Sequence, residues 1–317
     1  MKKVVCVGAC AWDTLLTGVD KKLMNIDSIL ADEYFASLGG DAANGAISFS
    51  RLGFDVSLMC NIGDDSNGES IIKYLKDNNV ETKYIHIDKS CNTASPIILV
   101  DETGDRHIIR IPRNANHHFD LSMIDIAALE NFDHLHFASA NVIPKIDGEP
   151  LAELFRKAKE YGLTISLDAS YAKDNNSFNN IKDALNYCDI FIPSLQEASE
   201  YARSDDLERI IEFFSVYPLK VFGIKLGEKG ALITDFKNRI TIPSLYNGTP
   251  IDTTGAGDAF IAGFVSGWLM DYELEKCAYL ASAQAASVLQ EIGACVSAGT
   301  LDDAYKLLSD KKILEED

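Results

Sequence analysis

The chain has 317 residues, of which 47% are hydrophobic, and its 29 basic and 48 acidic residues leave a formal net charge of −19. This length suits two domains, or one large α/β domain with an insertion, and it buries a sizeable core without disulfides. The acidity argues against nucleic acid or an anionic membrane as partner, because phosphate-rich surfaces need a basic footprint. A need for solubility is a sufficient explanation of the acidic composition. A local site can still bind phosphate through backbone N–H groups.

The cysteines and the N-terminus predict a cytoplasmic protein. The cysteines are scattered, odd in number and without a Cys-x-x-Cys pair, which is typical of a reducing compartment. Residues 1–12 are basic and then apolar, but Asp13 ends the run, so a first strand is expected rather than a signal peptide. No run of 18 apolar residues predicts a membrane span. The cysteines are Cys6, Cys10, Cys60, Cys91, Cys188, Cys277 and Cys295.

The first part of the chain combines strands with small-residue helices. An apolar run predicts a buried strand at residues 4–8, and another predicts one at 56–60. The run Gly39-Gly40-Asp41-Ala42-Ala43-Asn44 opens a helix that reaches about Leu52, and helical spacing continues over 66–78.

A different pattern covers residues 92–114. Two β-rich runs, 95–100 and 107–111, flank the turn-forming residues 101–105, which is a hairpin signal. Short strands are also expected within 14–38. We therefore predict a small separate β-sheet built from about 14–38 and 92–114.

After about residue 120 the pattern alternates between strand and helix. Such alternation is typical of βαβ units and predicts an α/β fold with a mostly parallel sheet. Helices are expected at 150–161 and, nearly all apolar, at 254–270. The predicted strands are 134–138, 163–168, 190–192 and 221–226, followed by a hairpin of 231–234 and 239–242.

The segment Asp252-Thr253-Thr254-Gly255-Ala256-Gly257-Asp258-Ala259-Phe260 carries the clearest chemical signal. Small residues at the start of a helix leave backbone N–H groups free, so that a phosphoryl group can approach them. Asp258 in the first turn is placed to accept a proton from an attacking hydroxyl. The plain alternative is a glycine-rich helix start with a favourable acidic residue. No Walker A lysine follows.

This segment resembles the C-terminal signature of the ribokinase-like carbohydrate kinases, the PfkB family. The N-terminal signature is similar as well: Gly39 to Asn44, then Arg51-Leu52-Gly53, then Asn61-Ile62-Gly63-Asp64-Asp65 and Gly68. The resemblance implies one ribokinase-like domain over 1–317, a Rossmann-like three-layer α/β fold, in which the small sheet covers the substrate as a lid. It further implies transfer of the γ-phosphoryl group of ATP to a hydroxyl of a sugar or nucleoside.

The resemblance also assigns roles to individual residues. Asp258 matches the catalytic base, and Gly255, Ala256 and Gly257 match the anion hole. The substrate-binding matches are Asp13, Gly39, Gly40, Asn44 and Arg113. The nucleotide-binding matches are Ser194, Lys225, Gly227, Gly230 and Ser282. Simpler alternatives are a strand-end cap for Asp13 and a solvated side chain for Arg113.

Metal ions are implied in the same way. Glu197 matches the residue that orders Mg²⁺ through water, although Ser194 stands where the family has Asn. A second departure is the run 169–172 after Asp168, so Ser170 is given no role. The remaining matches, to a K⁺ site in some relatives, are Asp252, Thr254, Gly293 and Ser297. Asp252 has the alternative of a plain turn residue.

We therefore expect an ATP- and Mg²⁺-dependent sugar kinase, with K⁺ as a further cofactor. A nucleoside kinase is the first alternative, and a non-catalytic sugar-binding relative is the second. The histidines lack the spacing of a zinc motif, so no zinc site is expected and His117-His118 is interpreted as a solvated pair. The resemblance implies that a homodimer can form through the lid strands, whose exposed edges pair readily, and the sequence leaves the oligomeric state open.

Overall fold

A large sheet forms the centre of the protein. The computed structural model of the chain describes residues 1–20, 25, 27–101, 106–170 and 177–313. Within them, nine strands pair in the order β15-β14-β13-β12-β11-β10-β1-β4-β6, in parallel from β6 to β13 and antiparallel beyond. The strands are β1 Lys3–Gly8, β4 Asp55–Met59, β6 Val80–Glu81, β10 His134–Ala140, β11 Thr164–Ala169, β12 Ile190–Phe191, β13 Val221–Lys225, β14 Ala231–Thr234 and β15 Arg239–Ile242.

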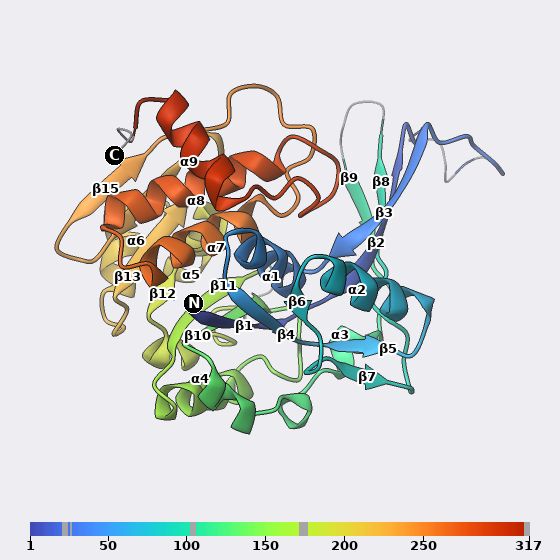
Figure 1. Ribbon diagram of the computed structural model, residues 1–317, viewed down its shortest axis with the longest axis horizontal. Coiled ribbons are helices and arrows are strands. Elements are labelled where there is room, and N and C mark those ends of the chain that lie inside the picture. The colour runs from blue at the N-terminus through green and yellow to red at the C-terminus, as the bar shows by residue number, and fades with distance from the viewer. Residues whose placement is uncertain (21–24, 26, 102–105, 171–176, 314–317) are drawn as a thin grey trace.

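Two layers of helices cover this sheet (Figure 1). In β1, Val4 and Cys6 pack into one hydrophobic cluster with α1, α2, α7, α8 and α9, while Val5 and Val7 pack into a second cluster with α4, α5 and α6. Strands buried on both faces explain why they are continuous apolar runs in the sequence. The helices are α1 Asp41–Arg51, α2 Ser66–Asp77, α3 Ala115–His118, α4 Glu149–Glu160, α5 Leu195–Ala202, α6 Leu207–Phe214, α7 Ala256–Leu269, α8 Leu274–Val288 and α9 Leu301–Asp310, with short 3-10 helices η2 Leu121–Met123, η3 Ala127–Asn131, η4 Ala184–Tyr187 and η5 Gly227–Lys229.

A small separate sheet stands beside the main body (Figure 1). Its four strands pair in the order β3-β2-β8-β9, with bounds β2 Ala11–Thr17, β3 Glu33–Gly39, β8 Ile97–Val100 and β9 Arg106–Ile109. The pairing of β8 with β9 is the antiparallel pairing that the sequence predicts, while the turn at 102–105 lies outside the described residues. A further pair joins β5 Asn61–Gly63 to β7 His86–Asp88.

The fold predicted from the sequence, a mostly parallel α/β sheet with a small second sheet, is confirmed. The predicted hairpin at 231–234 and 239–242 has the bounds of β14 and β15. The helix expected from residue 254 begins two residues later, as α7, because Gly255 adopts the left-handed conformation with φ 77°. β10 extends beyond the predicted 138, to Ala140.

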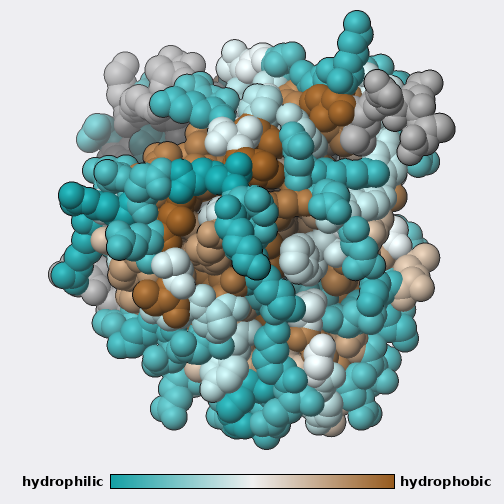
Figure 2. Space-filling view, turned by 90° about the vertical axis from the view of Figure 1, so that its left-hand side faces the viewer, coloured by the Kyte–Doolittle hydropathy of each residue, from teal (hydrophilic) through white to brown (hydrophobic). Residues whose placement is uncertain are grey.

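Hydrophilic residues predominate on the face of the molecule that carries α6, α9 and β15 (Figure 2). Smaller apolar areas lie between the polar residues on this face. Among the described residues, no helix is long and apolar enough to cross a membrane. The outer strands of the small sheet, β3 and β9, expose Tyr34 and Ile109, and the homodimer through this sheet stays a prediction.

Candidate active site

Two cavities open where β1, β10, β11 and β13 end, at the carboxyl edge of the parallel sheet. Open α/β sheets usually bind their ligands at this edge. One cavity, of about 630 Å³, lies between the main sheet and the small sheet. The other, of about 760 Å³, lies between α8 and the loops after β12 and β13. Asp41, Gly255 and Asp258 line both, so the cavities meet at the start of α7.

Asp258 is a buried carboxylate at this meeting point. It lies in the first turn of α7, and its Oδ2 accepts a hydrogen bond of 2.8 Å from Nδ2 of Asn44 on α1. Burial, followed by the carboxylates of Asp41 and Asp168, raises the pKa of Asp258 well above its ordinary value, against the lowering effect of Asn44 and Lys225. Because its charged form is destabilised, this carboxylate takes up a proton more readily than an exposed one.

The glycines before Asp258 shape the start of α7. A Cβ on Gly255 would lie 1.9 Å from the carbonyl oxygen of Ala294, and its φ of 77° already favours glycine. A Cβ on Gly257 would lie 3.1 Å from Nζ of Lys225. Among the described residues no side chain caps this helix, and Gly255, Ala256 and Gly257 line the cavity beside α8, while the N–H of Ala256 donates to the carbonyl of Thr253 at 3.4 Å. A helix start of this kind can bind an anion, and the anion hole stays a prediction.

The cavity beside the small sheet, called here the lid cavity, presents two acceptor oxygens without partners. Oδ1 of Asp13 and Oδ1 of Asn44 are buried, and neither has a hydrogen-bond partner among the described residues. Burial, aided by Asp41 and Asp252 and opposed by Arg110, raises the pKa of Asp13 to about 7. Because unpaired buried acceptors are costly, a ligand with hydroxyl donors would relieve them.

Gly39 and Gly40 leave room for this arrangement. A Cβ on Gly39 would lie 2.2 Å from the Asp13 carboxylate, so the carboxylate fits only over a glycine. Gly40 has φ 88°, and a Cβ there would lie 2.6 Å from the carbonyl oxygen of Ala9. Gly39 therefore lets β3 lie close to Asp13 of β2, and Gly40 lets the start of α1 lie close to the loop between β1 and β2.

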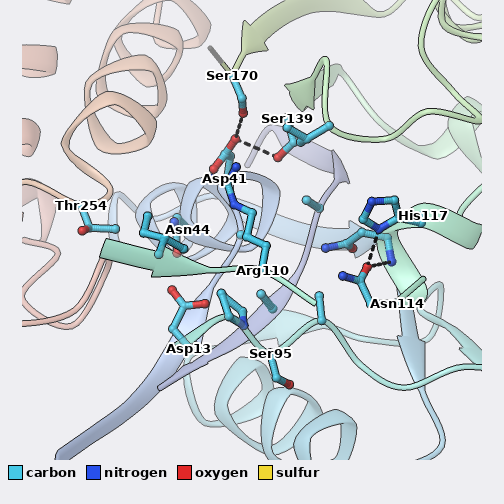
Figure 3. A pocket seen from close by; sticks show the side chains of 18 of the residues that line it. Asp13, Asp41, Asn44, Ser95, Arg110, Asn114, His117, Ser139, Ser170 and Thr254 are labelled. Carbon is cyan, nitrogen blue, oxygen red and sulfur yellow. Dashed lines mark hydrogen bonds between the residues drawn. The ribbon is translucent and has the colours of Figure 1, made fainter. Parts of the chain in front are cut away.

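The structure adds residues that sequence reasoning missed. Oδ2 of Asp41 accepts hydrogen bonds from Ser139, at 2.8 Å, and from Ser170, at 2.7 Å (Figure 3). Ser139 has φ 75°, an uncommon conformation for serine. Ser170, which departs from the family pattern, therefore orients the carboxylate of Asp41 between the two cavities. Tyr171 and Ala172, from the same run, lie outside the described residues.

The arginine of the lid cavity is Arg110, not the expected Arg113. Arg110 lines the cavity with Asp13 and His117, and its charge lowers the pKa of Asp13 (Figure 3). Arg113 is exposed and does not line either cavity. The sequence pattern singled out only Arg113 and placed Arg110 in the second strand of the hairpin. In the structure β9 ends at Ile109, and Arg110 follows it directly.

The second cavity, called here the α8 cavity, contains a partly buried lysine, Lys225, among carboxylates. Nζ of Lys225 forms an ion pair of 3.1 Å with Oδ1 of Asp168. Burial alone would lower the pKa of Lys225, but Asp168 and Glu197 outweigh it and hold that pKa above its ordinary value. Lys225 is therefore a charged group beside the start of α7.

Ser194 and Glu197 form a capping box at the start of α5. The backbone N–H of Ser194 donates to Oε2 of Glu197 at 2.8 Å, and the N–H of Glu197 donates to Oγ of Ser194 at 3.3 Å. Both residues line the α8 cavity. Asp168 and Glu197 supply carboxylate oxygens there, the ligands that Mg²⁺ prefers, so the residues present fit this ion.

Gly227, Gly230 and Ser282 also line the α8 cavity. Gly227 has open space where a Cβ would stand, whereas a Cβ on Gly230 would lie 1.9 Å from the carbonyl oxygen of Ile242. Oγ of Ser282 accepts from the N–H of Leu245 and donates to the carbonyl of Pro243, both at 3.1 Å. Ser282 thus anchors the segment after β15.

The residues expected for K⁺ are only partly brought together. The carboxylate of Asp252 accepts from the N–H of Thr254 at 2.7 Å and from the N–H of Gly293 at 3.0 Å. It ties the loop before α7 to the loop after α8. Ser297 instead donates to the carbonyl of Ser287 at 2.9 Å.

Known structures share this fold. Arabidopsis thaliana ribokinase, solved with ribose and ATP, aligns with a TM-score of 0.82 and 23% identity, covering 97% of this chain and 98% of that one. A putative ribokinase II from E. coli, solved with ATP and Mg²⁺, aligns with a TM-score of 0.85 and 20% identity, covering 98% and 100%. The architecture is thus that of the ribokinase-like kinases.

Sequence comparison gives the family. The model of the pfkB family carbohydrate kinases matches residues 1–301, and the chain belongs to this family of phosphotransferases. Ribokinase from Bacillus subtilis is 26% identical over 309 residues, covering 98% of this chain and 100% of the relative. The nucleoside kinase of Methanocaldococcus jannaschii is 25% identical over 320 residues, covering 99% of each. The chain is therefore a sugar or nucleoside kinase.

Proposed function

We propose that the protein transfers the γ-phosphoryl group of ATP to a hydroxyl group of a sugar bound in the lid cavity. The proposed acceptor is a primary hydroxyl. The observation that carries this proposal is that the two cavities meet at Asp258. A sugar in the lid cavity and ATP in the α8 cavity would place the acceptor hydroxyl, the γ-phosphoryl group and the carboxylate at one point. Phosphoryl transfer depends mainly on such positioning and on charge stabilisation.

In the proposed reaction, the sugar hydroxyl oxygen attacks the γ-phosphorus and the bond from that phosphorus to ADP breaks. Asp258 takes the hydroxyl proton, which its raised pKa favours. The N–H groups of Gly255, Ala256 and Gly257 hold the charge that develops on the phosphoryl oxygens. Lys225, beside the same turn, adds a positive charge. Mg²⁺, held through Glu197 and Asp168, would neutralise phosphate charge when bound.

The acceptor is proposed to be a sugar because the lid cavity offers hydrogen-bond acceptors for hydroxyl groups. Asp13 and Asn44 each present a buried oxygen without a partner among the described residues. Ribokinase is among the relatives, and a nucleoside kinase is the alternative, since its ribose carries the same hydroxyls.

The experiment that tests the proposal measures ADP release from ATP and Mg²⁺. The acceptor panel contains ribose, fructose, 2-keto-3-deoxygluconate, sugar phosphates, adenosine and inosine, with and without K⁺. Turnover on a sugar that Asp258→Ala abolishes would support the proposal. Turnover on a nucleoside alone would move the assignment to the alternative. Folded protein that binds ATP and turns over no acceptor in the panel would contradict it.

The binding of the sugar is expected to weaken as Asp13 becomes protonated. Because its pKa is about 7, Asp13 is mainly ionised at pH 8 and mainly neutral at pH 6. If the carboxylate accepts the sugar hydroxyls, KM for the sugar should rise roughly tenfold over this interval. Steady-state kinetics of Asp13→Asn should show a high KM that no longer follows pH. A wild-type sugar KM that is constant from pH 6 to 8 would contradict this role, and KM for ATP serves as the internal control.

Arg110 should favour acceptors that carry an acidic group. Its replacement, Arg110→Met, removes the cation of the lid cavity but keeps a long apolar stem. We expect KM to rise roughly tenfold or more for an acceptor with a carboxylate or phosphate, and less for a neutral sugar. The matched control is Arg113→Met, three residues along the chain and outside the cavities. Equal effects of the two substitutions on acidic acceptors would refute this role.

A further inference from the structure

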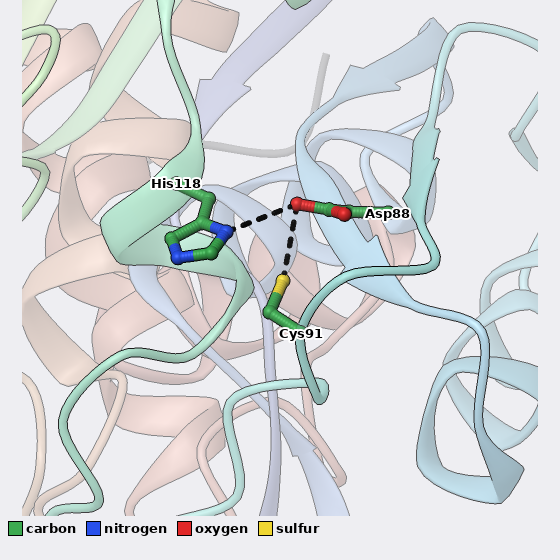
Figure 4. Close-up of side chains that lie close together, drawn as sticks. All are labelled: Asp88, Cys91 and His118. Carbon is green, nitrogen blue, oxygen red and sulfur yellow. Dashed lines mark hydrogen bonds and ion pairs between the residues drawn. The ribbon is translucent and has the colours of Figure 1, made fainter.

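Three side chains that line neither cavity converge near the small helix α3. Asp88 ends β7, Cys91 follows it in the next loop, and His118 ends α3. Nδ1 of His118 and Sγ of Cys91 each lie 3.2 Å from the same atom, Oδ2 of Asp88 (Figure 4). Each of the three residues offers a ligand atom that lies within 4.8 Å of those of the other two.

These distances approach those of a tetrahedral metal site. With Zn–N, Zn–O and Zn–S bonds of about 2.0–2.3 Å, neighbouring ligand atoms stand roughly 3.4–3.6 Å apart. The two distances of 3.2 Å to Asp88 are already close to this spacing, and no pair of ligand atoms in the cluster lies more than 4.8 Å apart. A thiolate, an imidazole and a carboxylate are the three ligand types that zinc uses.

The surrounding structure holds the three groups in place. The other oxygen of Asp88, Oδ1, accepts from the N–H of Ser90 at 2.7 Å and from its Oγ at 2.6 Å. Such outer contacts orient a ligating carboxylate. The N–H of Ala115 donates to the carbonyl of Asn92 at 2.9 Å, which ties α3 to the loop that carries Cys91.

The geometry does not suit a nucleophilic cysteine. In a Cys–His pair, the imidazole must face the thiol in order to accept its proton. Here both Cys91 and His118 direct the contacting atom at Asp88, so the carboxylate lies between them. A cation, by contrast, would replace the protons on the two groups and bind all three atoms.

We propose that Asp88, Cys91 and His118 form a binding site for a zinc-like divalent cation, with water completing the coordination. The side chain of His118 is 33% exposed and that of Asp88 11%, so an ion can enter from solvent. The bound cation would clamp α3 to the loop after β7. Because Asn116 and His117 of α3 line the lid cavity, the clamp would stabilise one wall of the proposed sugar site. Spacing along the chain does not predict this cluster, since its ligands come from segments 30 residues apart.

The test uses Co²⁺ as a spectroscopic probe on the full-length protein, after removal of metals with a chelator and without nucleotide. We expect one equivalent of Co²⁺ to produce a thiolate-to-metal charge-transfer band and tetrahedral d–d absorption, both displaced by Zn²⁺. Cys91→Ser and His118→Gln should lose these bands. The matched control His86→Gln, an exposed histidine on the same strand as Asp88, should keep them. The proposed Mg²⁺ site offers no thiolate, so the result does not depend on the proposed kinase function.

A second measurement uses the accessibility of the thiols. All seven cysteines lie in the described part of the chain, and Cys91 is the one among them that is not buried. Zn²⁺ should slow alkylation of Cys91 in the native protein at least tenfold, as mapped by mass spectrometry. At a hundredfold excess over Kd, Zn²⁺ should also raise the Tm of the wild-type protein by roughly 4 °C. It should leave the Tm of His118→Gln unchanged. Absence of the charge-transfer band, its persistence in Cys91→Ser, or unchanged alkylation would overturn the proposal.

Discussion

Asp258→Asn is expected to lower kcat by about 10²–10⁴-fold, the range by which a positioned general base accelerates a reaction. Asparagine has nearly the same shape and can still accept the hydrogen bond from Asn44, but it cannot take the proton of the acceptor hydroxyl. KM for the sugar and for ATP should change much less than kcat. Steady-state ADP release measures both, with Asp77→Asn, an exposed carboxylate at the end of α2, as the matched control.

The same substitution should stabilise the fold above neutral pH. Burial and the neighbouring Asp41 and Asp168 raise the pKa of Asp258, so its protonated form is favoured in the folded state. Stability from this group is therefore present at low pH and is lost as pH rises through the folded-state pKa. The amide of the Asp258→Asn variant stays neutral at every pH in this range. Its Tm should therefore exceed that of the wild type at pH 8, and the difference should shrink toward pH 5.

A thermal scan of both proteins from pH 5 to pH 8 checks this expectation. Higher stability combined with lower activity is the result expected of a carboxylate kept in a costly environment for its chemistry. A variant with wild-type turnover would refute the role of Asp258 as base. A variant less stable than the wild type at pH 8 would show instead that the carboxylate contributes to the fold.

The general fold was readable from the sequence because its signals are local. Buried parallel strands appear as continuous apolar runs, and α7 follows a glycine-rich start, so both are visible in short windows. The hairpin of β8 and β9 is likewise a short-range pattern. That residues 14–38 and 92–114 share a sheet was also predicted, but the parallel pairing of β2 with β8, with Thr14 opposite Ile97, is a long-range register that only the folded chain displays.

The candidate site was less readable, because its side chains come from distant elements. Asp258 and Asn44 are joined by a hydrogen bond across 214 positions, and no spacing rule predicts it. Asp41 was visible only as part of a glycine signature, while its contacts with Ser139 and Ser170 depend on three separate elements. Arg110 and Arg113 are alike in the sequence, and the turn of the backbone after β9 decides which one reaches the lid cavity.

Gly255→Ala should impair both the fold and the reaction. The added methyl group would require a conformation with φ 77° and would lie 1.9 Å from the carbonyl oxygen of Ala294. Left-handed strain and overpacking each cost about 1–3 kcal/mol, so unfolding should become easier by roughly 2–6 kcal/mol. For a chain of 317 residues, this corresponds to a fall in Tm of roughly 3–9 °C.

The matched variant Gly257→Ala separates the two effects. Gly257 lies inside the first turn of α7 without a positive φ, and alanine there favours a helix by roughly 0.5–1 kcal/mol. Its methyl group would stand 3.1 Å from Nζ of Lys225, at the proposed anion hole. We therefore expect Gly257→Ala to keep the wild-type Tm or exceed it. Its N–H remains, but the methyl group would keep the phosphoryl group from reaching it, so kcat should fall about 10²–10³-fold, as when one anion-hole donor is lost.

Thermal scans and ADP release on both variants distinguish the cases. If Gly257→Ala were fully active, the close approach of the phosphoryl group to this turn would be refuted. If Gly255→Ala were as stable as the wild type, the contact with Ala294 would not hold the turn in place.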